Sequence, residues 1–190
     1  MRLAHAALAR VLPAILALLQ GCASLLPPAT TTETEIPEVW RGRFALTVAA
    51  TPQAAEQRST GRFVLTAAKA YTELELVSPL GNTLASARSD SSGALLKTAD
   101  GKTFSAASPE ALTEQVFGWR VPVDRLPAWL RGEVEQVQER AADGNGTTRT
   151  AEGIDHGWSV RFEQWGARQP QRLTASFPQR AVLRLVVDDF

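Results

Sequence analysis

Cys22 is the first residue to consider for covalent chemistry, because the 190-residue chain contains no other cysteine. A lone cysteine cannot form a disulfide within its own chain, so attachment of a lipid is the more economical role for its thiol. The alternative is an ordinary signal peptide that ends beside an incidental cysteine. The residues that precede Cys22 bear on this choice.

Residues 1–21 have the composition of a secretory signal peptide. Arg2 and Arg10 supply positive charge near its start, and residues 11–19 form an apolar stretch. This stretch is too short to span a membrane, which takes about 20 apolar residues. We therefore predict a lipoprotein signal peptide at residues 1–21 and no membrane-spanning helix there.

The tetrad Leu19-Gln20-Gly21-Cys22 resembles the bacterial lipobox, although glutamine replaces the small residue that is usual at the second position. The resemblance implies cleavage before Cys22, a thioether-linked diacylglycerol on its sulfur and an N-acyl chain on its amino group. We expect no cofactor beyond this covalent lipid. Ala23, in place of an aspartate after the cysteine, implies an address in the outer membrane.

The rest of the chain offers little for catalysis or metal binding. Once residues 1–21 are removed, His156 is the one histidine, so a zinc site would need carboxylates as its other ligands. A serine hydrolase would have to use His156, yet the sequence has no G-x-S-x-G elbow. A phosphate-binding loop at residues 101–103 would require glycine at position 96, which is Leu96. We expect no catalytic residues, no metal site and no enzyme, and we keep an envelope hydrolase as the weakest alternative.

Charge also limits the possible partners. After loss of residues 1–21, 18 basic residues face 20 acidic ones, which argues against nucleic acid and against a polybasic membrane anchor. Residues 22–38 carry Pro and Thr without periodicity, and we predict a lipidated tether that spans about 20–24 Å when flexible. Residues 39–190 then form one domain of ordinary size.

Period-two alternation of apolar residues predicts that this domain is mainly β. Asp100-Gly101 is typical of a hairpin turn, and Gly144-Asn145-Gly146 separates two of the later strands. We expect an α+β fold in which an open antiparallel β-barrel or curved sheet is covered by a few helices and encloses an apolar cavity. The expected strands are 44–48, 62–66, 71–77, 83–88, 95–97, 102–104, 133–140, 158–164, 172–177 and 182–187.

Two helices interrupt the strands. Ser108 suits an N-cap, Pro109 follows at the first helical position, and Gly118 closes the helix after about Phe117. A second, short helix is predicted to begin at Asp124 as its cap and to stop at Gly132.

The turn Ser78-Pro79-Leu80-Gly81 places a leucine where solvent is expected. Proline at the second position and glycine at the fourth suit a type I turn, which leaves Leu80 near the tip. Such a leucine gains about 1.5–3 kcal/mol on entering an apolar phase. The alternatives are that Leu80 folds back on the domain or is one of many harmless exposed leucines.

The aromatic residues allow two interpretations. All five tryptophans and seven phenylalanines lie in the domain, where they could fill a core or line a lipid cavity. Composition alone does not separate these uses.

Three groups of residues, in this order, resemble the LolB family of outer-membrane lipoproteins, whose members receive other lipoproteins and insert them into that membrane. The groups are the lipobox with Ala23, then Trp40-Arg41-Gly42-Arg43-Phe44 with Gly61-Arg62-Phe63, and then Ser78-Pro79-Leu80-Gly81 with the tryptophan-containing segments 118–123 and 126–132. The resemblance covers most of residues 40–135, and the last strands match by pattern alone.

The resemblance implies an open β-barrel that takes acyl chains from a soluble periplasmic carrier of similar fold. It also implies that Leu80, flanked by Pro79 and Gly81, puts the cargo into outer-membrane lipid. The protein is then expected to be a monomer that is anchored at Cys22 and faces the periplasm. The acyl-chain cavity candidates are Trp40, Phe44, Leu46, Phe63, Leu65, Leu74, Leu76, Trp119 and Trp129. The runner-up is a structural outer-membrane lipoprotein that scaffolds an envelope complex without binding acyl chains.

Overall fold

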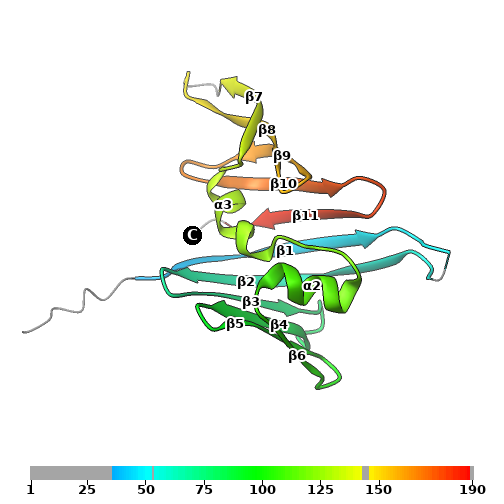
Figure 1. The fold of residues 1–190 in the computed structure, drawn as a ribbon. Helices are drawn as coiled ribbons and strands as arrows, with labels where there is room; N and C mark the ends of the chain where they lie inside the picture. Colours follow the sequence, from blue (N-terminus) through cyan, green and yellow to red (C-terminus); the bar gives the residue numbers. More distant parts are fainter. Residues whose placement is uncertain (1–35, 53, 143–145, 189–190) are drawn as a thin grey trace, which may run out of the picture. The chain divides into compact units, whose positions relative to one another are not determined.

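The computed structural model describes residues 36–52, 54–142 and 146–188, which build a single antiparallel sheet with helices on one face (Figure 1). Its eleven strands follow the order β6-β5-β4-β3-β2-β1-β11-β10-β9-β8-β7. Within the described residues β6 and β7 remain the two edges, so the sheet is open. The expected open, mainly β fold with a few helices is confirmed.

The strands β1 to β6 run along one half of the sheet and β7 to β11 along the other. They are β1 (Glu38–Val48), β2 (Gln57–Ala68), β3 (Tyr71–Val77), β4 (Thr83–Asp90), β5 (Gly93–Thr98), β6 (Thr103–Ala106), β7 (Gln136–Ala142), β8 (Thr148–Asp155), β9 (Trp158–Trp165), β10 (Pro170–Phe177) and β11 (Ala181–Val187). Pairing of β1 with β11 joins the two halves in the middle of the sheet.

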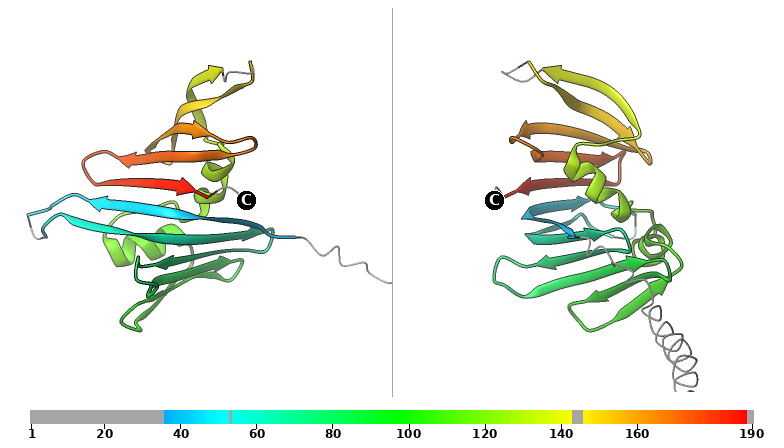
Figure 2. Two further views of the ribbon diagram at one scale, coloured as in Figure 1. Left: turned by 180° about the vertical axis from the view of Figure 1, so that it is seen from behind. Right: turned by 90° about the vertical axis from the view of Figure 1, so that its left-hand side faces the viewer.

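The helical segment between β6 and β7 connects the two outer edges of the sheet. It contains α2 (Pro109–Phe117), the 3-10 helix η1 (Val123–Arg125) and α3 (Leu126–Arg131). Because the chain must travel from one edge to the other, this segment crosses one face of the sheet, as both views in Figure 2 show. Among the described residues no helix has the length and apolarity needed to span a membrane.

Cross-strand glycine and phenylalanine pairs explain the spacing of the motif at the start of the sheet. Gly42 lies opposite Phe63, and Phe44 lies opposite Gly61. A Cβ at either glycine would collide with the ring opposite and with a backbone carbonyl of the next strand. The two glycines therefore let adjacent strands approach while the aromatic rings cover them.

The first helix follows its capping residues as expected. The Ser108 side chain accepts a hydrogen bond from the Ala111 amide at 3.2 Å, and Gly118 ends α2 with φ 75°. The second helix differs at its start, since Asp124 lies inside η1 and the residue before α3 is Arg125, with no side-chain cap. The predicted cap is wrong, because Asp124 belongs to a 3-10 turn that continues directly into α3 and so lacks the extended backbone of a capping residue. The predicted end of the helix at Gly132 is confirmed.

The strand β8 was not predicted. Its sequence TRTAEGID has one large apolar residue, Ile154, so no alternation marks it as a strand. It follows the predicted turn at 144–146, of which Gly144 and Asn145 lie outside the described residues, and it pairs with β7 and β9. The strand is therefore specified by its neighbours and not by its own pattern.

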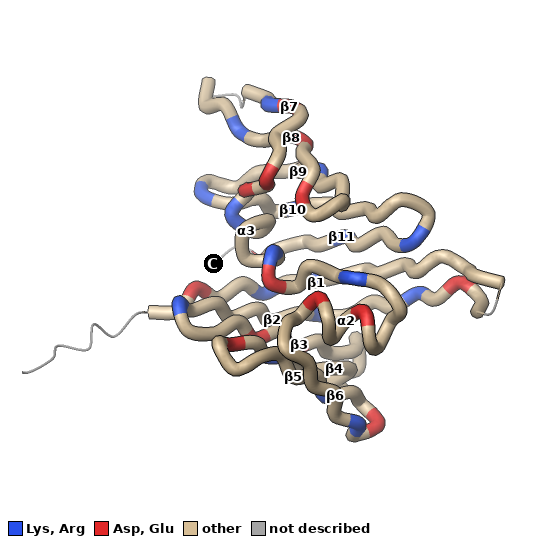
Figure 3. The backbone as a smooth tube through the Cα atoms, in the orientation of Figure 1, with Lys and Arg blue, Asp and Glu red and all other residues tan. Residues whose placement is uncertain are grey.

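Most large buried side chains belong to one cluster between the sheet and α3. Trp129, Leu130 and Trp158 are almost completely enclosed, together with Leu65 and Leu173. A smaller cluster joins α2 to β5 through Leu112 and Leu96. Lys and Arg are interspersed with Asp and Glu over the described chain, as Figure 3 shows, in keeping with the near-neutral charge of the sequence.

Candidate functional site

A cavity of about 560 Å³ lies between the sheet and the helical segment that crosses it. Its volume falls within the range of about 300–1,000 Å³ that is usual for small-ligand sites. Its walls come from strands β1 to β5, from Trp158 on β9, from β11, from the loops after β1 and β10, and from residues 109–130, and most of the lining residues are apolar. Polar atoms in such a cavity are few, so it suits a hydrocarbon ligand.

Eight of the nine cavity candidates line this space. They are Phe44, Leu46, Phe63, Leu65, Leu74, Leu76, Trp119 and Trp129. Trp40 does not line it: this side chain is buried in the core, and its Nε1 donates a hydrogen bond to Gln169 Oε1 at 3.0 Å. Trp40 shares a strand face with Phe44 but lies four residues, about 13 Å, nearer the start of β1.

Other residues that line the cavity were not among the candidates chosen from the sequence. Leu112 and Val116 on α2 face the cavity, and their spacing of four residues was a usable helical pattern. Leu183 and Leu185 on β11 were detectable by alternation in the same way. Ala85 and Ala87 on β4 carry no such pattern, because alanine is common on every kind of surface.

An aromatic cluster forms the wall where the helical segment meets β9. The ring of Trp158 lies 5.7 Å from Trp119, 5.9 Å from Trp129 and 5.6 Å from Phe177, measured between centroids. These distances are typical of favourable aromatic pairs. Three of these residues, Trp119, Trp129 and Trp158, also line the cavity, so tryptophans serve as both core and wall here.

One buried carboxylate fixes the helical segment to the sheet. Asp155, at the end of β8, is fully enclosed and accepts hydrogen bonds from Arg125 Nη2 at 2.8 Å and Trp129 Nε1 at 3.0 Å. Burial raises the pKa of Asp155, but the hydrogen bonds from Arg125, His156 and Trp129 outweigh it and the net shift is downward. The ionised side chain therefore ties η1 and α3 to the turn between β8 and β9.

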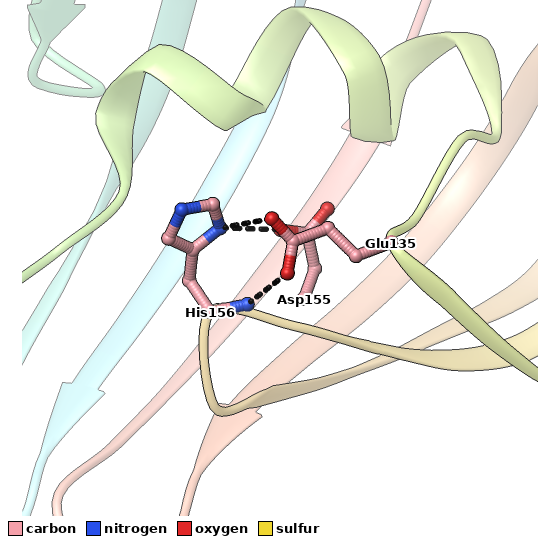
Figure 4. A group of neighbouring side chains, drawn as sticks. All are labelled: Glu135, Asp155 and His156. Atoms are coloured by element: carbon pink, nitrogen blue, oxygen red, sulfur yellow. Dashed lines mark hydrogen bonds and ion pairs between the residues drawn. The ribbon is translucent and has the colours of Figure 1, made fainter.

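His156 completes this group, which Figure 4 shows together with Glu135 and Asp155. Its Nδ1 lies 2.7 Å from Asp155 Oδ1 and 3.3 Å from Glu135 Oε1. The hydrogen bond with Asp155, followed by the nearby carboxylate charges, raises the pKa of His156 despite partial burial. Potential metal-ligand atoms of the three residues lie within 4.8 Å of one another, but Arg125 already neutralises Asp155, so the group is an ion-pair network.

The predicted turn at Leu80 is exposed. The Gly81 amide donates to the Ser78 carbonyl at 2.9 Å, which closes the turn, and the Leu80 side chain is 90% exposed. Leu80 therefore does not fold back on the domain. Pro79 and Gly81 flank it and are exposed as well.

The turn lies at one end of the sheet, together with exposed residues of the cavity lining. β1 and β3 run in the same direction, so the 78–82 turn shares an end with the loop between β1 and β2 and with the turn between β10 and β11. Several lining residues at that end are exposed, among them Ala54, Ala55 and Gln179. Cys22 lies outside the described residues.

Comparisons with known proteins point to one family. The family described as "Outer membrane lipoprotein LolB" matches residues 40–190. Proteins named outer-membrane lipoprotein LolB from Dechloromonas aromatica and Bordetella petrii are 35% and 34% identical over 178 residues, which cover 91% and 90% of this chain and 92% and 87% of theirs. A protein of the same name from an Azoarcus species is 32% identical over 182 residues, 92% of this chain and 90% of its own.

Proposed function

The chain belongs to the LolB family of outer-membrane lipoproteins, and we propose that its cavity receives the acyl chains of other lipoproteins before they enter the outer membrane. The donor in this scheme is a soluble periplasmic carrier of similar fold. The cargo moves from cavity to cavity to bilayer, and the protein itself catalyses no covalent step.

The observation that carries this proposal is the cavity of about 560 Å³, whose lining is mostly apolar. A triacylated lipoprotein exposes about 45 methylene groups, each contributing roughly 0.8 kcal/mol on burial. Free passage through water would thus cost on the order of 35 kcal/mol. Direct transfer between apolar environments avoids that cost and needs no nucleotide.

Leu80 is the residue we propose for the last step. A side chain that is 90% exposed gains about 1.5–3 kcal/mol by entering the hydrocarbon of a bilayer. The turn stands at the same end of the sheet as the exposed cavity rim, so insertion of Leu80 brings that rim to the membrane. The cargo then has a short apolar path out of the cavity.

In this proposal Cys22 determines where the protein is located. Acylation there would hold the protein on the periplasmic face of the outer membrane, and a tether over residues 22–38 would leave the domain about 20–24 Å of reach. The described strands begin at Glu38, where such a tether would end.

The test is a Leu80→Glu variant compared with Leu95→Glu, which changes another exposed leucine, on β5. Both variants should keep the wild-type melting temperature and take lipoprotein from the loaded carrier. Only Leu80→Glu should lose transfer into liposomes, measured by flotation of the cargo with the vesicles. Normal transfer by Leu80→Glu would overturn the role of the turn, and failure of the wild type to take cargo would overturn the function.

A further inference from the structure

A buried hydrogen-bond donor on a residue that lines the cavity has no acceptor in the protein. Trp158 is 1% exposed, and its indole Nε1 is the one buried side-chain nitrogen or oxygen without a partner among the described residues. Buried indole N–H groups normally find an acceptor, because leaving one unpaired is unfavourable. This exception therefore calls for an explanation.

The other two deeply buried tryptophans follow the rule. Trp40 donates to Gln169 Oε1 at 3.0 Å, and Trp129 donates to Asp155 Oδ2 at 3.0 Å. Of these three tryptophans only Trp129 and Trp158 line the cavity, and Trp129 already has its acceptor. Trp158 is thus the indole whose N–H is left for a ligand.

The surroundings of Trp158 restrict what can reach it. Its ring packs against Trp119, Trp129 and Phe177, and solvent does not reach Nε1. Trp119 lies on the irregular segment between α2 and η1 and is only half-buried, so it is the neighbour best able to move. An acceptor in the cavity would reach Nε1 after a shift of one of these rings.

We propose that the Trp158 indole N–H donates a hydrogen bond to an acyl carbonyl oxygen of the bound lipoprotein, an inference that rests on the proposed function. Each acyl chain of such a cargo ends in an ester or amide carbonyl, an acceptor that must otherwise lose its hydrogen bond to water on entering the cavity. An indole nitrogen is a donor only, so it matches a carbonyl and offers nothing to a hydrocarbon tail. The bond thereby sets how deeply a chain is inserted.

The test compares two ligands with the same number of heavy atoms, of which only the first has a hydrogen-bond acceptor: methyl hexadecanoate and nonadecane. Each competes with a fluorescent apolar probe for the purified wild-type protein and for Trp158→Phe. The ratio of ester affinity to nonadecane affinity should be roughly three- to tenfold higher in the wild type than in Trp158→Phe. The comparison cancels packing changes, since both ligands fill nearly the same volume.

Trp165→Phe is the matched control, because Trp165 is a half-buried tryptophan that does not line the cavity. This variant should keep the wild-type ratio of ester affinity to nonadecane affinity. An unchanged ratio in Trp158→Phe overturns the hydrogen bond while leaving acyl binding intact. If neither ligand displaces the probe from the wild type, the cavity function fails and the inference with it.

A second measurement does not depend on the variant folding. In wild-type protein labelled with ¹⁵N-tryptophan, the Trp158 indole N–H resonance should shift downfield with a triacylated lipopeptide and with the methyl ester, but not with nonadecane. Phosphatidylethanolamine presents the same ester carbonyl from a membrane source. A shift with this phospholipid and none with the lipopeptide overturns the assignment to cargo.

Discussion

The buried carboxylate of Asp155 links the helical segment that crosses the sheet to the sheet itself. Replacing it with alanine leaves the Arg125 guanidinium and the Trp129 indole without their acceptor. Removing one partner of a buried ion pair costs about 3–5 kcal/mol, so Asp155→Ala should lower the free energy of unfolding in urea by that amount. Glu152→Gln, which removes a more exposed pair with Arg161, should cost less than about 1 kcal/mol. Equal effects would contradict the structural role of Asp155.

The raised pKa of His156 makes a small part of the stability depend on pH. The hydrogen bond with Asp155 favours the imidazolium, so its stabilising contribution is complete below the ordinary pKa of 6.5 and is lost as pH rises through the higher pKa of the folded state. Asparagine tolerates the left-handed φ of 50° at this position but does not titrate.

The advantage of wild type over His156→Asn in melting temperature should therefore shrink between pH 6 and pH 9. The His156 side chain is 42% exposed, which limits the change to about 2 °C. Differential scanning calorimetry across this range would measure it. A difference that stays flat or grows with pH would show that the Asp155 contact does not favour the charged imidazole.

Among the elements, α2 and α3 both end at a glycine in the left-handed region, but their surroundings differ. A Cβ at Gly118 would meet nothing, whereas a Cβ at Gly132 would fall within the Trp165 ring. Gly118→Ala should cost about 1 kcal/mol for backbone strain alone. Gly132→Ala should cost about 1–3 kcal/mol more, because α3 must shift or the ring must leave its place. Equal losses on urea unfolding would mean that the Trp165 contact does not hold α3.

The elements could be predicted where their own residues carry the information. Ser108 and Gly118 defined α2 because capping is a local interaction, and the turn at Leu80 followed from proline and glycine in fixed positions. The strand β8 could not be predicted, since its partners β7 and β9 supply what its sequence lacks. The prediction that Asp124 caps the second helix was wrong because aspartate, a common capping residue, also occurs within 3-10 turns.

At the scale of the whole molecule, the sequence predicted the apolar faces but could not separate a filled core from a cavity. Phe44 and Leu74 are apolar for either purpose, and Trp40 has the same pattern yet lies in the core. The difference arises from the path of residues 107–135, which crosses the sheet and leaves space beneath it. That path depends on contacts such as Arg125 with Asp155, which are thirty residues apart.

Whether the cavity binds the acyl chain can be tested by placing a large side chain on the face of one strand that lines it. Ala87 on β4 lines the cavity opposite Leu74 and Leu96, whereas Ser86 points to the other face of the sheet. Ala87→Phe should weaken binding of an apolar fluorescent probe by about tenfold or more, because a bound chain would then be overpacked. Ser86→Phe adds the same ring without entering the cavity and should bind as wild type does. Equal binding by both variants would place the acyl chain elsewhere on the protein.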